Sequence, residues 1–254
     1  MKNLNVETSI REVKSDREIS IIKKLAEDIS EILRLAKKKI QPGISTLELD
    51  LFIEDMIRQY DCEPAFKGYR GYPASSCISI NEELVHGIPK ANKKIQKGQL
   101  VSIDIGIKRD GFYADIATTV YIEDKNVKNE TREKIINLMN VTYQSINHVM
   151  PYIKEGLKVG ELGYIIQSFV ESHNYSVIRE YVGHAIGRQL HEKPDIPNFG
   201  EKGYGVSLVA NMVICIEPMV SSGDWKTAVC DDGWTVVMKD GSLCAHYEHM
   251  ILVN

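Results

Sequence analysis

The sequence predicts an α+β protein of two similar halves, in which helices cover one face of a mainly antiparallel sheet. The first observation is the order of the periodic segments, which read helix, helix, strands and then helix, helix, strands. The second is that each half contains an apolar strand with one carboxylate near its end, at Gln99–Asp104 and at Asn211–Glu217. We expect residues 1–254 to form a single domain, with halves at about 1–125 and 126–254.

Two helices open the first half. Apolar residues recur at helical spacing over about 16–40, and Pro42 ends this helix. Ser45 and Glu48 have the spacing of a capping box, in which each side chain accepts a hydrogen bond from the backbone N–H of the other residue. A second helix is therefore expected to begin after Ser45 and to continue through Ile57.

Short runs rich in β-branched and apolar residues follow these helices, and Asp110-Gly111 between two of the runs is typical of a hairpin turn. The second half repeats the order, with Pro151 ending its first helix. The helices expected there span about 129–149 and 159–173. The strands expected along the whole chain span 76–80, 100–107, 113–122, 177–182, 212–217, 235–238 and 247–253.

Composition excludes several classes of protein. The formal net charge is -4 with basic residues mixed among acidic ones, whereas nucleic acids and anionic membranes are bound by basic patches. No apolar run approaches the ~20 residues of a membrane helix, and Met1–Asn5 do not open an apolar signal segment. The five cysteines lack C-x-x-C spacing, which favours a reducing compartment. We expect a cytoplasmic protein with no nucleic-acid or membrane partner.

Asp104 is unusual because it lies within a β-type run, where aspartate is depleted. A buried carboxylate is costly unless it is paired or bound to a metal. Asp115 lies on the returning arm of the expected hairpin. A turn at Arg109-Asp110 places it opposite Asp104, and a turn at Asp110-Gly111 makes the two diagonal neighbours; both place them on one face. Pairing with a lysine or arginine is the structural alternative.

Further candidate ligands adjoin strands in the second half. His184 and His191 lie in a glycine-containing segment, which suggests backbone packed closely around a site. Glu217 ends an apolar strand, and Glu248 precedes the final strand. Each residue alone also fits a structural or solvated role, but carboxylates combined with imidazole are typical of Mn, Fe, Co or Zn sites. A bridging carboxylate pair is typical of dinuclear centres.

Six short motifs occur in order along the chain. They are Ser79–Glu82 leading to His86–Pro89, Ile103-Asp104, Asp110–Phe112 leading to Asp115, Gly183-His184 through His191–Pro194, Ile216–Met219 and Tyr247–His249. The series resembles type I methionine aminopeptidases, the bacterial form of the pita-bread metallopeptidases, over nearly the whole chain. The resemblance implies the pita-bread (creatinase/aminopeptidase) fold. It also implies a metal-dependent hydrolase that removes N-terminal methionine when the second residue is small.

The resemblance implies a role for each candidate ligand. Asp104 would bind one metal ion bidentately, and Asp115 and Glu248 would bridge both ions. His184 and Glu217 would complete the coordination of the other ion. Glu217 would also act as a general base that takes a proton from water. The implied cofactors are two divalent ions, Co, Mn, Fe or Zn, among which the sequence does not choose.

Two histidines outside the ligand set are implied to contact the substrate. His191 would polarise the scissile carbonyl, and His86 would contact the following peptide nitrogen and help protonate the leaving amine. The methionine side chain would enter an S1 pocket suited to a flexible apolar thioether. The implied pocket residues are Phe66, Tyr69, Tyr72, Cys77, Leu190 and Trp234.

Three residues depart from the family pattern. Ala185 stands where glycine is usual, Phe66 where bacterial relatives often have cysteine, and His246 where glutamine is common. Phe66 and Leu190 are expected to reshape the S1 wall and so to affect fine specificity more than activity. The implied partners are N-termini of nascent polypeptides at the ribosome, and a monomer is expected.

Two rival functions remain possible at this point. Enzymes of the same fold that cleave next to proline, of the prolidase or aminopeptidase P type, resemble the catalytic part. They usually carry a substantial extra N-terminal domain, whereas the first implied pocket residue here, Phe66, lies early in the chain. The other rival is a catalytically inactive binding protein with this fold. It would be expected to have lost ligands, whereas all five are present.

Overall fold

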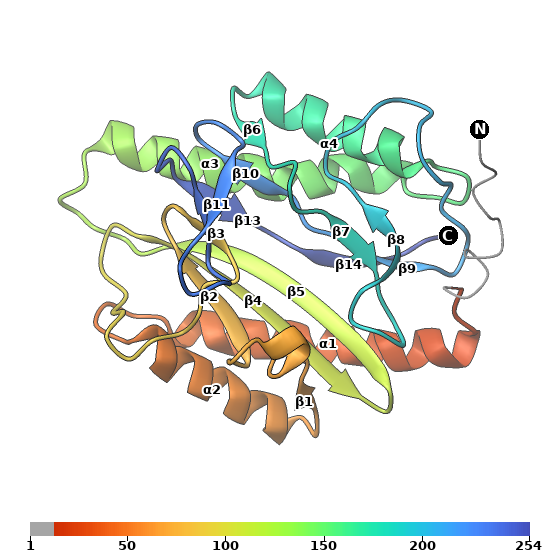
Figure 1. Cartoon of the computed structure of the whole chain (residues 1–254), viewed down its shortest axis with the longest axis horizontal. Coiled ribbons are helices and arrows are strands. Elements are labelled where there is room, and N and C mark those ends of the chain that lie inside the picture. Colours follow the sequence, from red (N-terminus) through yellow and green to blue (C-terminus); the bar gives the residue numbers. More distant parts are fainter. Residues whose placement is uncertain (1–12) are drawn as a thin grey trace.

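Four α-helices form in the described residues, where the sequence predicts them. The structure is a computed structural model that describes residues 13–254 (Figure 1). The capping box predicted at Ser45 is confirmed, and Ser15 forms a second one. Met1–Asn5, on which the expected lack of a signal segment rests, lie outside the described residues. The helices are α1 (Asp16–Lys39), α2 (Thr46–Gln59), α3 (Asn129–Val149) and α4 (Val159–Ser172).

The longest strands, β4 (Leu100–Arg109) and β5 (Phe112–Tyr121), form the predicted hairpin. Asp110 and Gly111 make the turn, and both have positive φ angles, which favour a two-residue turn. Asp104 pairs with Ala117, and Gly106 pairs with Asp115. Asp104 and Asp115 are therefore diagonal neighbours on one face of the hairpin, as the second of the two predicted registers requires.

The other strands are short, and every pair recorded among the described residues is antiparallel. The sheets are ordered β1-β4-β2 with β5 on β4, β13-β10-β6, β11-β12-β3 and β14-β9-β7-β8. The bounds are β1 (Glu63–Pro64), β2 (Ser76–Ile80), β3 (Glu83–Val85), β6 (Ser176–Val177), β7 (Gly183–Ala185), β8 (Glu192–Ile196), β9 (Val213–Ile216), β10 (Met219–Ser221), β11 (Thr227–Val229), β12 (Val236–Met238), β13 (Cys244–His246) and β14 (His249–Leu252). Two 3₁₀ turns add η2 (Tyr69–Gly71) and η3 (Met150–Tyr152).

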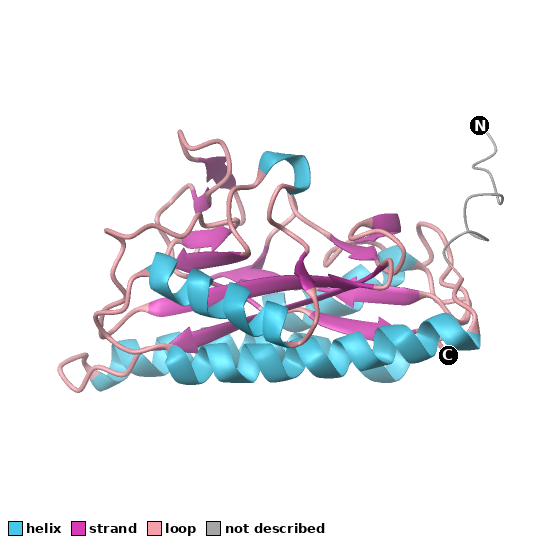
Figure 2. Ribbon diagram, turned by 90° about the horizontal axis from the view of Figure 1, so that it is seen from below, coloured by secondary structure: helices cyan, strands magenta, loops and turns pink. Residues whose placement is uncertain are grey.

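Each half buries an apolar core between its helices and its strands. Side chains such as Leu25 and Ile53 of α1 and α2 pack with Ile78 and Ile103 of the first sheet. A second core joins α3 and α4 to β9 and β14. In Figure 1 the two helix pairs lie on opposite sides of the view with the strands between them, and Figure 2 shows the long helices along one side of the strands. The predicted α+β layout with helices on one face of antiparallel sheet is confirmed.

The two halves meet where β5 runs beside the segment that joins β13 to β14. Ala117 forms an isolated antiparallel bridge with Glu248, whose N–H donates to the Ala117 carbonyl at 3.0 Å. The hydroxyl of Thr119 accepts from the N–H of His246 at 2.9 Å and donates to its carbonyl at 2.8 Å. These backbone contacts fix the carboxylate of Glu248 next to those of the β4–β5 hairpin.

One predicted strand is wrong over most of its length. The sequence predicts a strand over 177–182, but only Ser176 and Val177 are extended in β6. The partner strand β10 has only three residues, and two of them pair with Ser176 and Val177. The third, Met219, accepts a hydrogen bond from the Ile178 N–H through its carbonyl. Residues 179–182 have no strand to pair with there, and local β-propensity does not form a strand without a neighbour.

Within residues 13–254, no helix combines the length and the apolar content that a bilayer span needs. All five cysteines are free thiols.

The capping box at Ser45 yields a stability prediction. Ser45→Ala removes the hydroxyl that accepts from the Glu48 N–H, so the free energy of unfolding should fall by about 1 kcal/mol in urea denaturation. Ser30→Ala is the control, because the Ser30 hydroxyl only donates to a carbonyl of its own exposed helix turn. A loss at Ser45 no larger than at Ser30 would contradict the capping role.

Candidate metal centre

Three carboxylates are brought together by strand register. Cys77, Asp104, Ala117 and Glu248 form one row across β2, β4, β5 and the segment before β14. Asp115 lies two residues from Ala117, so its side chain shares that face. Ligand oxygens of Asp104, Asp115 and Glu248 lie within 4.8 Å of one another. Two elements distant in sequence therefore supply one carboxylate cluster.

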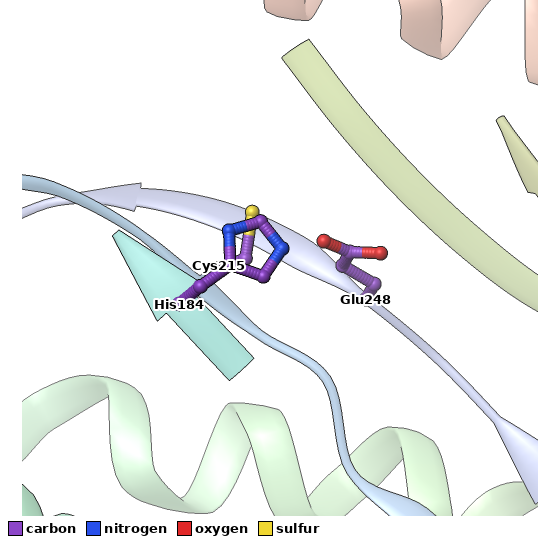
Figure 3. A group of neighbouring side chains, drawn as sticks. All are labelled: His184, Cys215 and Glu248. Carbon is purple, nitrogen blue, oxygen red and sulfur yellow. The ribbon is translucent and has the colours of Figure 1, made fainter. Parts of the chain in front are cut away.

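The second half adds an imidazole, a thiol and another carboxylate. His184 lies on β7, Cys215 lies on β9, and Glu217 directly follows β9. One ligand atom each from His184, Cys215 and Glu248 lie within 4.8 Å of one another. Figure 3 shows the Cys215 sulfur and the Glu248 carboxylate both close to the His184 imidazole. His184 Nε2 lies 3.5 Å from Glu217 Oε1.

Three of the carboxylates each have one buried oxygen without a hydrogen-bond partner among the described residues. Asp104 Oδ1, Asp115 Oδ1 and Glu248 Oε1 accept no hydrogen bond there. Burial raises the pKa of Asp104 to about 7, and burial together with the charge of Asp104 raises the pKa of Glu248 to about 8. The pKa values of Asp115 and Glu217 are also raised, first by burial and then by Glu248. An isolated arrangement of this kind is costly, and bound cations would remove the cost.

The histidines around the carboxylates are held neutral. Burial lowers the pKa of His184 to about 4, and burial and the charge of His184 lower the pKa of His191 to about 3. His184 Nδ1 lies 3.1 Å from the Ala185 carbonyl, which can only accept a hydrogen bond. Nδ1 therefore carries the proton, and Nε2 presents its lone pair to the cavity. This orientation is the usual one for a metal-ligating histidine.

The two donor sets fit divalent metal ions. One set is carboxylate only, the other contains His184, and Glu248 belongs to both. Unpartnered buried oxygens and a neutral imidazole with a free lone pair are the groups that Mn, Fe, Co or Zn accept. A carboxylate shared by two sets is the arrangement expected of a dinuclear site.

All of the site residues predicted from the sequence line one cavity between the halves. Asp104, Asp115, His184, Glu217 and Glu248 lie in its polar part, with His86 and His191 nearby. The His191 ring packs 4.3 Å from that of His184, and its Nδ1 lies 2.9 Å from the Tyr69 hydroxyl. The remaining predicted lining residues are Phe66, Tyr69, Tyr72, Cys77, Leu190 and Trp234.

Hydrogen bonds and ring contacts hold the apolar wall of the cavity. The Tyr72 hydroxyl donates to backbone carbonyls of Ser76 and Gly87, and its ring meets Trp234 edge to face at 5.1 Å. Phe66 is buried against Gly106, where a Cβ would collide with the Phe66 ring. His86 has φ +58°, a backbone conformation that is unfavourable for a side-chain-bearing residue and is often found at functional sites.

Sequence reasoning missed two residues of the site. Cys215 lies two residues before Glu217 on the same strand, so strand alternation alone could have placed its thiol on the ligand face. Burial raises the pKa of this thiol, which keeps it protonated without a metal. Arg70 also lines the cavity. It lies in η2 with positive φ, and no sequence signal distinguishes it.

His246 also faces the site. Its side chain is buried, and its Nε2 has no hydrogen-bond partner among the described residues. Nε2 lies 3.8 Å from Glu217 Oε2, so Glu217 stands between the imidazoles of His184 and His246. The departure from glutamine noted in the sequence therefore places a second imidazole beside this carboxylate.

Comparison with known proteins gives a consistent result. The sequence model of metallopeptidase family M24 matches residues 20–254. The methionine aminopeptidase of Mycoplasma capricolum is 43% identical over 243 residues, covering 95% of this chain and 94% of that protein. The crystal structure of the Thermotoga maritima methionine aminopeptidase is 41% identical with a TM-score of 0.90, covering 95% of both chains. Prolidase from Pyrococcus furiosus, at 23% identity and a TM-score of 0.75, shares the fold over all of this chain and 66% of its own.

The buried carboxylates generate a prediction for metal-free protein. In the unfolded chain a carboxyl group loses its proton above about pH 4. In the folded protein the raised pKa keeps that proton bound to a higher pH. Stability should therefore fall as pH rises toward the folded values, by about 1 kcal/mol per pH unit for each such carboxyl. We expect the melting temperature of metal-stripped protein to drop between pH 6.5 and 8.5, a window above the ordinary histidine pKa.

Two comparisons isolate the carboxylates as the cause. Glu248→Gln, which cannot ionise, should give a shallower decline, and added Mn should flatten the decline in the wild type. A melting temperature that is constant or rises over this range in stripped wild-type protein would contradict the assignment.

Proposed function

Because the chain belongs to metallopeptidase family M24, we propose that it is a methionine aminopeptidase, which removes the N-terminal methionine of polypeptides whose second residue is small. The observation that carries the proposal is the cavity between the halves, which combines a carboxylate and imidazole cluster with an aromatic-lined apolar wall. Relatives of about 40% identity that span nearly the same length are named methionine aminopeptidases. The pita-bread fold is common to these enzymes and to prolidases.

We assign the metal ligands to five residues. Asp104, Asp115 and Glu248 would hold one divalent ion, and His184 and Glu217 would hold the other together with the shared carboxylates. Divalent ions bound there would supply Lewis acidity, which polarises a peptide carbonyl and lowers the pKa of bound water toward ~7. The donor set suits Co, Mn, Fe or Zn and does not choose among them.

Glu217 is proposed as the general base. It directly follows β9, and its oxygens lie 3.5 Å from His184 Nε2 and 3.8 Å from His246 Nε2. A carboxylate at this place in the cavity can accept a proton from water. Glu217 would take a proton from the attacking water and deliver it toward the leaving amine.

His191 and His86 are proposed to hold the peptide during this proton transfer. His191 is neutral and is oriented by the Tyr69 hydroxyl and by the His184 ring, so it can donate one hydrogen bond to the scissile carbonyl. His86 is also neutral, with its ring edge to face with Trp234 and Tyr181. From this position it would contact the nitrogen of the following residue.

The apolar wall is proposed as the S1 pocket. Phe66, Tyr72, Cys77, Leu190 and Trp234 surround a space beside the carboxylates, and all of them belong to one apolar cluster. A thioether side chain is flexible and makes favourable contacts with aromatic rings, so methionine suits this lining. The Phe66 ring would leave less room in the pocket than the cysteine that bacterial relatives often have there. A narrower pocket would favour substrates whose first side chain is unbranched.

The substrates, cellular location and oligomeric state are also proposals, and they follow from the proposed activity. The substrates would be N-termini of nascent polypeptides at the ribosome, and the enzyme would act as a cytoplasmic monomer of a single domain. A prolidase-type activity and an inactive binding protein remain the rival functions. The close relatives of equal length argue against the first, and the complete set of five ligands argues against the second.

A peptide panel tests the activity directly. Metal-stripped protein is mixed with Met-Gly, Met-Lys and Xaa-Pro peptides, and Mn, Fe, Co or Zn is added back one at a time. We expect metal-dependent release of methionine from the Met-Gly peptide only. Faster cleavage next to proline would favour the prolidase-type rival, and no cleavage with any metal would favour the binding protein.

Substitution of the base gives a second prediction. Glu217→Gln should lower kcat about 10²- to 10⁴-fold while KM changes little, because the amide cannot accept the proton. Metal content should be measured in parallel, since Glu217 is also an assigned ligand. Glu133→Gln on the exposed face of α3 is the matched control. Undiminished turnover of a fully metal-loaded Glu217→Gln enzyme would exclude Glu217 as the base.

A further inference from the structure

The loop between β7 and β8 carries two of the cavity residues, Leu190 and His191. It has no helix or strand of its own. One end is anchored to the hairpin, where the Tyr113 N–H donates to the Gly187 carbonyl at 2.9 Å. Within the loop the Gly187 N–H donates to the Gln189 carbonyl at 3.2 Å, and side-chain contacts add to this bond in determining where His191 points.

The buried carboxylate of Glu192 binds backbone N–H groups of this loop. Glu192 Oε1 accepts hydrogen bonds from the N–H of Arg188 at 2.6 Å and from the N–H of Gln189 at 3.1 Å. The Glu192 side chain is 4% exposed. A carboxylate in this position organises the turn, but it requires a counter-charge because it is removed from water.

Lys14 supplies that charge from the other end of the chain. Its Nζ lies 2.6 Å from Glu192 Oε2, and its side chain is fully buried. The Lys14 N–H donates to the Asn211 carbonyl at 3.0 Å, which fixes where the side chain enters. The stem packs directly on the loop, since a Cβ at Gly187 would collide with Lys14 Cε.

A second contact from the same segment holds the outside of the loop. The Arg188 guanidinium donates to Glu18 in the first turn of α1, with Nε and Nη2 at 2.8 and 2.9 Å from its two oxygens. Arg188 Nη2 also lies 3.4 Å from the carbonyl of Val13. The segment Val13–Glu18 thus contacts the loop on both sides, and Lys14 is its buried contact.

We propose that Lys14 is a positioning residue of the active site, which acts through Glu192 to hold the loop so that His191 and Leu190 face the cavity. The proposal rests on the proposed function, since it assigns catalytic value to the position of His191. Among the described residues, the recorded ion pair of Lys14 is with Glu192 and not with the carboxylate cluster. Its effect passes through the two amides that Glu192 fixes.

The energetics favour a positioning role over a purely stabilising one. A buried ion pair contributes little net stability compared with apolar residues of the same volume. What it does provide is a defined geometry, since the Lys14–Glu192 ion pair forms only when the Glu192 carboxylate points toward Lys14. Misplacement of a contacting residue by about 1 Å can reduce catalysis by about 10²-fold, so loop geometry is where the pair has its effect.

The test compares Lys14→Met, which keeps the stem and removes the charge, with Lys14→Met/Glu192→Gln, which removes both charges. Because the double variant removes both charges of the buried ion pair, it remains informative if the single variant does not fold. Lys24→Met on exposed α1 is the matched control. Two readouts are taken: hydrogen exchange of the Arg188 and Gln189 amides in metal-free protein, and kcat and KM for methionine release from a Met-Gly peptide with metal.

We expect exchange at these two amides to rise at least about tenfold in both folded variants, beyond any rise in the core strands. We also expect kcat/KM to fall about 10- to 100-fold with unchanged metal content. Exchange that rises equally throughout the protein, or wild-type exchange and turnover in the folded double variant, would overturn the proposal. Failure of the proposed function is recognised separately, because the wild type and Lys24→Met would then release no methionine.

Discussion

Repulsion among carboxylates that are buried together is the constraint on which the rest of the structure depends. Asp104, Asp115 and Glu248 line one cavity, and each has a buried oxygen without a hydrogen-bond partner among the described residues. Their raised pKa values express the cost of this arrangement. The fold maintains it because the strands that present the carboxylates pack on large apolar cores. Bound cations would make the close approach of these carboxylates electrostatically favourable.

The geometry of the strands determines what the cluster can do. Strand register places Asp104 and Glu248 in one row and Asp115 beside them, while β7 and β9 bring His184, Cys215 and Glu217 from the opposite side. The loop after β7 adds His191 next to His184. Metal ligands, a proton acceptor and substrate contacts therefore occupy one cavity whose other wall is apolar. That combination is suited to hydrolysis of a peptide with an apolar first residue.

Sequence reasoning recovers most of this arrangement, for physical reasons. Helices are predictable because capping boxes and apolar periodicity act locally, as at Ser45. The diagonal relation of Asp104 and Asp115 follows from a two-residue turn and strand alternation. The contact of Glu248 with Ala117 could not be predicted this way, since it joins distant segments through tertiary packing. The ordered motifs, by resemblance rather than geometry, suggested that these residues belong together.

The failures of sequence reasoning have equally definite causes. Residues 179–182 have strand-like composition but lie beside a partner strand that is too short. Cys215 resembles an ordinary core cysteine, and only its alternation with Glu217 along the strand marks it in the sequence as a residue of the site. The pairing of Lys14 with Glu192 spans almost the whole first three quarters of the chain, and nothing in the local sequence around Lys14 indicates burial. A long-range ion pair such as this one is therefore visible only in the fold.

The central claim is that the carboxylate cluster is a dinuclear metal site. Anomalous diffraction from a crystal of the protein grown with Mn tests it most directly. The account predicts two anomalous peaks in the cavity, one bound by Asp104, Asp115 and Glu248 and the other adjoining His184 and Glu217. No peak in this cavity, or manganese bound only elsewhere on the protein, would contradict it.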